Sequence, residues 1–233
     1  MPAGTFQYWT GAAWTTDSQY IRCTIVDELG LPMRAEVTVA NHSGGTARNN
    51  RENFYADYQQ VRFTEGNTSR ILFYGKVERT EPKWDDEYGQ ILIVYARDNL
   101  QELNKRTINE RFASITTRSG LVSNLVTNYS YSGNISTADA VKFLTSPVSF
   151  AARAFDYQGS GISALKAISE LADTDPIDST PTGVAHDYYL DAEFSGTSPT
   201  PDLHYFPRGS RPAGGGQTHG LECSILAADG TKS

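Results

Sequence analysis

Cysteine is scarce in this sequence: Cys23 and Cys223 are the only two among 233 residues. So few cysteines exclude the disulfide-stapled scaffolds that are common among small secreted domains. Cys23 alternates with Ile21 and Ile25, and we expect it to face a core as a small apolar residue. A disulfide bond between the two cysteines would require the two ends of the chain to meet.

Long apolar runs are also missing. No segment approaches the roughly 20 consecutive apolar residues of a membrane helix. The N-terminal sequence MPAGTFQYWTGAAW has neither the basic start nor the apolar run of a signal peptide. We therefore expect a protein that is made in a cytoplasm, remains soluble and does not insert into a membrane.

Basic residues are outnumbered, with 20 Lys and Arg against 27 Asp and Glu and a formal net charge of -7. The sequence contains no cluster of Lys and Arg of the kind that neutralises nucleic-acid phosphates. This argues against sequence-specific binding of DNA or RNA. An acidic protein can still surround a nucleic acid without holding it, because like charges prevent adhesion.

Patterns that signal catalysis or metal binding are absent as well. None of the four histidines lies at metal-ligand spacing; they are His42, His186, His204 and His219. There is no G-x-S-x-G motif around a nucleophilic serine, and the segment GSGIS lacks the lysine of a phosphate-binding loop. We therefore expect no cofactor, no bound metal and no enzymatic activity.

What the sequence does contain is a series of strand patterns in its first hundred residues. Apolar and polar residues alternate, or apolar residues dominate, in five segments separated by turn residues. The expected strands cover residues 20–29, 34–41, 58–66, 70–79 and 90–98. Five antiparallel strands with short connections are enough for a small barrel.

The polar segment EPKWDDEYGQ connects two of these apolar strands. Paired carboxylates such as Asp85 and Asp86 can cleave glycosidic bonds, but only when they face each other about 5 to 9 Å apart. Pro, Asp and Gly are the residues of a hairpin loop, so we interpret the segment as a solvated tip. Trp84 and Tyr88 are large for an exposed loop, and we expect them to pack on a neighbouring subunit.

The run Ile91 to Ala96 is apolar at successive positions, which predicts burial on both faces of the strand. One face would be covered by the core and the other by another layer or subunit. We expect Ile93 to point into the core. Leu92 or Val94, whichever faces outward, would then belong to a subunit interface.

After residue 98 the pattern changes to helices and short strands. SGLVSNLVTNY has apolar residues at helical spacing, with Thr117 or Ser119 as a candidate N-cap. A second helix should begin at Ser160, and its apolar stripe consists of Ile162, Leu165, Ile168 and Leu171. The strand pair HDYYLDAEF and PDLHYFPRG should pack against that stripe.

The expected fold class is therefore α+β, mainly β. We divide the chain into an N-terminal extension at 1–19, a β-barrel at 20–106, an α/β insertion at 107–208, and a linker with the start of a return strand or second barrel at 209–233.

Four blocks in this order resemble a known family. They are ILFYGKVERTE, ARDNLQELNKRTI, SGLVSNLVTNY and QGSGISALKAISELADT. Their order and spacing are similar to those of the baseplate or tail hub proteins of tailed phages, which include the late control D proteins. The N-terminal part of type VI secretion spike proteins is similar too. The resemblance covers roughly residues 20 to 230.

This resemblance implies a barrel like that of the tail-tube subunit, interrupted by a small α/β insertion and followed by a second barrel. Three copies would mimic a six-fold ring and join the hexameric tail tube to a trimeric spike. The implied role is a structural virion protein in the tail, with a homotrimer, the tube protein and the spike protein as partners. DNA would pass through the channel during genome ejection without specific binding.

The sequence departs from the family at its end, where LECSILAAD is the only strand of a second barrel. Either the chain is part of a longer hub or another polypeptide supplies the remainder. Two alternative functions stay open: a carbohydrate-binding β-module that recognises a host surface, and a hub-like spike component of a phage-derived injection system. The carbohydrate-binding alternative predicts exposed aromatic residues in a row on one face.

Overall fold

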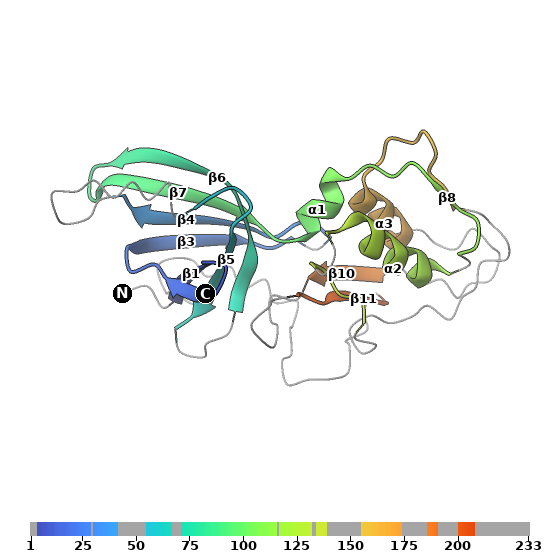
Figure 1. Ribbon diagram of the computed structural model, residues 1–233, viewed down its shortest axis with the longest axis horizontal. Helices are drawn as coiled ribbons and strands as arrows, with labels where there is room; N and C mark the ends of the chain where they lie inside the picture. Colours follow the sequence, from blue (N-terminus) through green and yellow to red (C-terminus); the bar gives the residue numbers. More distant parts are fainter. Residues whose placement is uncertain are drawn as a thin grey trace, which may run out of the picture.

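The computed structural model describes residues 4–28, 30–41, 55–66, 71–115, 117–131, 134–138, 155–173, 186–190 and 200–207. They form two units side by side, a β-sheet and a smaller unit of helices and short strands (Figure 1). The sheet contains β1 (Gly4–Trp9), β2 (Trp14–Thr16), β3 (Tyr20–Val26), β4 (Arg34–Ala40), β5 (Gln60–Glu65), β6 (Ile71–Asp85) and β7 (Gly89–Arg97). The second unit contains α1 (Leu100–Lys105), β8 (Arg111–Phe112), α2 (Arg118–Tyr129), β9 (Phe155–Asp156), α3 (Ala164–Asp173), β10 (His186–Leu190) and β11 (Leu203–Pro207).

The seven strands of the sheet follow the order β2-β1-β5-β6-β7-β4-β3 and pair antiparallel. The predicted hairpin is confirmed: β6 pairs with β7 from Lys76 opposite Arg97 to Asp85 opposite Gly89. The mainly β fold class is confirmed as well. Among the described residues no ladder joins β2 to β3, so the structure has a seven-stranded sheet where the sequence predicted a closed five-stranded barrel.

The sheet curls around its own core. The ring of Tyr20 on β3 lies 6.5 Å from Phe6 on β1 and 5.5 Å from Phe63 on β5, although these strands are not neighbours in the sheet. Cys23 packs against the same core, as its alternation predicted, and burial raises the pKa of its thiol to about 12. Cys223 lies outside the described residues.

Residues assigned to an N-terminal extension instead supply two strands of the sheet. Phe6 and Tyr8 on β1 point into the core, while Gln7 lies between them on the other face. β1 pairs with β5, with Gly4 opposite Glu65 and Tyr8 opposite Val61. This partner is far away in the sequence, so the local pattern of β1 gave no sign of the pairing.

Gly75 lies within β6, two residues before the bulge between Val77 and Arg79. A Cβ atom at Gly75 would lie 2.2 Å from the backbone oxygen of Arg97. A side chain here would collide with the backbone at the end of β7, so glycine is required at this position.

The second unit has its own core, built from all three helices and the strand pair β10–β11. The predicted packing is confirmed, because Leu165, Ile168 and Leu171 of α3 share this core with residues of β10 and β11. Thr117 caps α2, accepting a hydrogen bond from the backbone N–H of Gly120 at 3.1 Å. The predicted cap of α3 is wrong: the helix begins after Ser163, whose Oγ accepts the Lys166 N–H at 3.2 Å, and Ser160 lies in the preceding turn.

Several expectations fall outside the described residues. They are the linker, the return strand at 221–230, and the positions of His42 and His219. In the part of the chain that the structure describes, no helix is both long and apolar enough to span a bilayer.

Candidate functional site

The tip of the β6–β7 hairpin is the first candidate site. The last pair between β7 and β4 joins Ile91 to Ala40, whereas β6 and β7 continue to pair as far as Asp85 and Gly89. The end of the hairpin therefore projects beyond the neighbouring strand, as Figure 1 shows at one end of the sheet. Gly89 has a φ of 69°, which closes the turn at a position that favours glycine.

The two adjacent aspartates at this tip do not form a catalytic pair. Oδ1 of Asp85 accepts the backbone N–H groups of Glu87 and Tyr88, both at 3.0 Å, so this carboxylate holds the turn together. Asp86 is exposed. A glycosidase needs two carboxylates facing one substrate, and here one of the two is occupied by the backbone.

The two aromatic side chains of the tip are exposed. Trp84 is 72% exposed and Tyr88 is 41% exposed. A hydrogen bond to the carboxylate of Glu87 raises the pKa of Tyr88. Large exposed rings on a projecting hairpin suit a contact with another molecule, and a role in a subunit interface stays a prediction for both.

The expected outward orientation of Leu92 or Val94 is wrong. Both side chains are fully buried within the core of the sheet. Because side chains alternate across a strand, Ile91 and Ile93 point to the opposite face, so the expected core position of Ile93 is wrong as well. Both are also buried, so this chain by itself covers both faces of the run. The apolar run therefore needs no second subunit for its burial.

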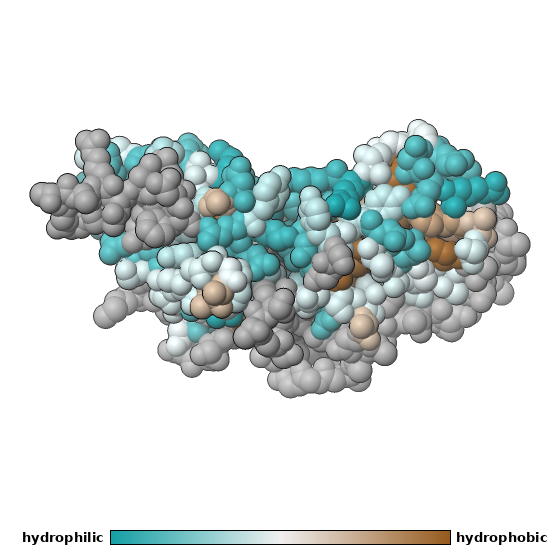
Figure 2. Space-filling model, viewed as in Figure 1, coloured by the Kyte–Doolittle hydropathy of each residue, from teal (hydrophilic) through white to brown (hydrophobic). Residues whose placement is uncertain are grey.

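Polar side chains surround Ile93 on that opposite face. Its neighbour in the register on β6 is Glu81, whose carboxylate accepts a hydrogen bond from the Tyr95 hydroxyl at 3.2 Å. Arg79 lies over the ring of Tyr95 at 4.0 Å, and Lys83 lies 3.2 Å from Glu81. In the view of Figure 2 the sheet is mostly hydrophilic, and hydrophobic colour gathers over the helical unit. Around Ile93 the described neighbours on this face are thus charged or polar.

A second site, which the sequence analysis missed, lies where the sheet meets the helical unit. Glu78 on β6 accepts from three side chains: Arg97 at 2.8 Å, Lys105 at 3.1 Å and Gln101 at 3.1 Å. The donors come from β7 and from α1, so one carboxylate links the sheet to the helix that follows it. No local motif marks such a site, because its members are brought together by the strand pairing.

Glu102 on α1 is the second carboxylate of this junction. It accepts from the Lys76 ammonium group at 2.5 Å, the Asn134 amide at 2.8 Å and the Tyr131 backbone N–H at 3.0 Å. The side chains of Lys76 and Glu102 are only 18% and 11% exposed. Charge-assisted bonds of this kind gain strength when water is partly excluded.

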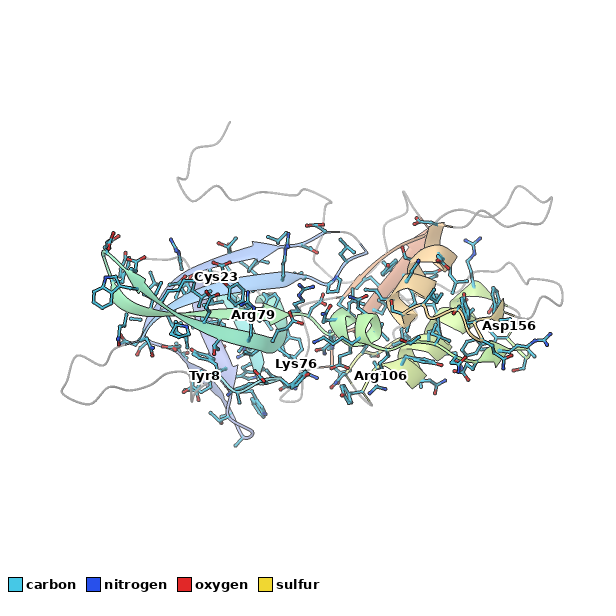
Figure 3. The ribbon with its side chains drawn as sticks, turned by 90° about the horizontal axis from the view of Figure 1, so that it is seen from above. Tyr8, Cys23, Lys76, Arg79, Arg106 and Asp156 are labelled. Atoms are coloured by element: carbon cyan, nitrogen blue, oxygen red, sulfur yellow. The ribbon has the colours of Figure 1, made fainter. Side chains whose placement is uncertain are left out.

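Cations and aromatic rings cover the surface of the junction. Tyr131 is 57% exposed, with the Arg106 guanidinium 4.5 Å and the Lys76 ammonium 5.6 Å from its ring centroid. Tyr58 is 65% exposed, with the Lys105 ammonium 5.7 Å from its ring. Figure 3 shows Lys76 and Arg106 on the same side of the molecule, where the two units meet. We call these five residues the junction surface.

Asp98 is buried behind this junction. Its two carboxylate oxygens accept the backbone N–H groups of Met33 and Leu100, each at 3.0 Å. The side chain thus joins the turn before β4 to the start of α1. Burial raises the pKa of Asp98 to about 8, and the two N–H groups offset this only in part.

The described residues contain no group of His, Cys, Asp and Glu that could hold a metal ion. His204 is buried on β11 within the helical unit. The exposed large rings of the described chain lie at two separate places, the hairpin tip and the junction, and Tyr58 and Tyr131 are not in a row with Trp84 and Tyr88. This distribution does not match a carbohydrate-binding face.

Comparison with known proteins gives a consistent result for the fold. No family model matches the sequence, and no curated protein matches it. The structure is similar to the tail protein from Neisseria meningitidis MC58, with 11% identity, a TM-score of 0.53, and coverage of 86% of this chain and 50% of that one. It is also similar to the 43 kDa tail protein of prophage MuSo2 from Shewanella oneidensis, with 12% identity, a TM-score of 0.50, and coverage of 87% and 54%.

A third similar structure is the E. coli c3393 protein, a component of the type VI secretion system that is described as similar to the T4 bacteriophage tail proteins gp27 and gp5. Identity is 11%, the TM-score is 0.51, and coverage is 87% of this chain and 45% of that one. The chain thus spans about half the length of each of these structures. The suspected resemblance is confirmed in structure: this chain shares the fold of phage tail proteins and of a type VI secretion component.

Proposed function

We propose that this chain is a structural, non-enzymatic hub protein of a phage tail or of a phage-derived injection system. The observation that carries the proposal is the fold similarity to two phage tail proteins and a type VI secretion component over 86% or 87% of the chain. The described residues add no catalytic carboxylate pair and no metal-binding group. An assembly role fits a chain that carries two exposed rings, Trp84 and Tyr88, on a projecting hairpin.

In this role the curled sheet acts as a tube-like barrel once assembled, and three copies surround the channel between the tail tube and the spike. The hairpin tip, with Trp84 and Tyr88, contacts a neighbouring subunit. The net charge of -7 keeps the wall of the channel from holding the DNA that passes during genome ejection. The protein would then reside in the tail of the virion, with the tube and spike proteins as partners.

The test is reconstitution with the tube and spike proteins from the same genome. Native mass spectrometry should find three copies of this chain bound to one spike trimer. Electron microscopy should place them at the end of the tube. A chain that remains monomeric with both partners present would refute the hub assignment.

A further inference from the structure

We propose that the junction surface of one copy receives the hairpin tip of the next copy in the ring. The inference rests on the proposed hub function and adds to it the surface that the hairpin tip contacts on the neighbouring copy. The occupant is a second copy of this chain, because this chain itself carries a projecting element whose charge and rings complement the surface.

The charge of the tip is negative. Asp85, Asp86 and Glu87 follow one another at the turn. Asp85 is bound by backbone N–H groups, and the nearby Lys83 is paired with Glu81. No ion pair of Asp86 or Glu87 occurs within the described residues. Within the described residues the tip therefore presents two carboxylates without an ion pair, of which that of Glu87 accepts a hydrogen bond from Tyr88.

The charge of the junction is positive. Its cations are Lys76, Arg97, Lys105 and Arg106, and the carboxylates that they surround are Glu78 and Glu102. Lys76 is paired with Glu102, and both Arg97 and Lys105 bind Glu78. The guanidinium of Arg106 lies over a tyrosine ring, and no carboxylate pairs with it in the described part of the chain. The cluster thus has two cations in excess on a chain whose total charge is -7.

Both surfaces also carry exposed aromatic rings. Trp84 and Tyr88 flank the tip carboxylates, and Tyr58 and Tyr131 flank the junction cations. An arginine that already lies over one ring can accept a second ring on its other face, and such contacts gain strength when water is excluded. Rings around a charge pair also keep water away from it, which is the arrangement that makes an interfacial ion pair effective.

The positions of the two surfaces on the chain suit a ring. The tip lies at one end of the sheet and the junction at the other, where the helical unit begins (Figure 1). A contact between two different surfaces is heterologous, and it closes into a ring when the rotation between copies allows. The tip alone is smaller than the roughly 800 Å² per partner of a stable interface, so this contact sets register and specificity within a larger one.

Charge reversal tests the proposal. The variants are Asp86→Lys at the tip, Arg106→Glu at the junction, and the chain with both changes. Arg111→Glu is the control, because it reverses the charge of an exposed arginine on β8 of the helical unit, outside the junction surface. Each single reversal should weaken assembly at least about tenfold, and the combined variant should recover most of that loss. Circular dichroism should show an unchanged fold for all four.

Assembly is measured by sedimentation velocity on the chain alone, and with the tube and spike proteins if the chain alone is monomeric. If the wild type assembles and the single variants assemble equally well, this inference fails while the hub function stands. If both single variants are weak and the combined variant is no better, the two surfaces are not partners. If the wild type stays monomeric with both partner proteins, the hub function and this inference fail together.

Discussion

The ammonium group of Lys76 on β6 lies 2.5 Å from the carboxylate of Glu102 on α1. The two residues belong to different units of the molecule, and both side chains are mostly shielded from water. Together with Glu78, this pair fixes the direction in which α1 leaves the sheet. In the proposed hub such rigidity matters, because the angle between the two units of one copy would decide whether successive copies close into a ring.

Replacing Glu102 with alanine should therefore destabilise the protein. The change removes three hydrogen-bond acceptor contacts and leaves the ammonium group of Lys76 partly buried without its partner. We expect a loss of about 2 kcal/mol in the free energy of unfolding. Glu28→Ala is the control, because Glu28 pairs with Arg34 at a site where both side chains are more than half exposed, and it should change stability by less than about 0.5 kcal/mol. Urea denaturation measures both, and equal effects would contradict the structural role of the junction.

Asp98 should make stability depend on pH. Its pKa is raised to about 8 in the folded chain, against about 3.9 when unfolded. Between these values the folded state holds a proton that the unfolded state has lost. The free energy of unfolding should therefore fall as the pH rises from about 4 to about 8, and the contribution should be complete only below about 4.

The variant Asp98→Asn isolates this effect. At pH 5.5 the hydroxyl oxygen of the protonated carboxyl can still accept an N–H group of Met33 or Leu100, whereas the NH2 group of the amide cannot, so the variant should be the less stable protein. The difference from the wild type should shrink or reverse by pH 8.5, because the amide never ionises. Urea denaturation of both proteins across this pH range gives the difference in their free energy of unfolding. A difference that does not change with pH would show that the pKa of Asp98 in the folded protein lies outside this range.

The sequence predicted the features that depend on local pattern. Alternation identified the core position of Cys23, and the turn residues between two apolar runs identified the hairpin that ends at Asp85. It could not assign the faces of the run at Leu92 and Val94, because a strand that is apolar at successive positions has no polar residue to mark the outside. The junction was missed for another reason. Glu78 and Glu102 meet their partners only after the strands have paired, and charged residues on a strand and a helix otherwise indicate solvent exposure.

Leu165 provides a test of the core of the helical unit. Its side chain is 5% exposed and packs with the strand pair β10–β11, so Leu165→Ala should cost roughly 2 to 5 kcal/mol in the free energy of unfolding. Ile162 precedes the helix and is only partly buried, so Ile162→Ala should cost less. Thermal or urea denaturation measures both. A loss near zero at Leu165 would mean that this face of α3 is solvated.

The two aspartates of the hairpin tip should contribute differently to the free energy of unfolding, and neither should support catalysis. Asp85→Ala removes the acceptor of two backbone N–H groups and should cost about 1 kcal/mol. Asp86→Ala removes an exposed carboxylate and should leave the free energy of unfolding within about 0.5 kcal/mol of the wild type.

The conservative change of both Asp85 and Asp86 to asparagine tests catalysis. It should preserve the fold, because the amide oxygen at position 85 still accepts from the backbone of the turn. The same proteins are then incubated with cell-wall glycan. If the wild type hydrolyses the glycan and the double variant does not, these aspartates take part in catalysis. The purely structural role of this turn would then be wrong.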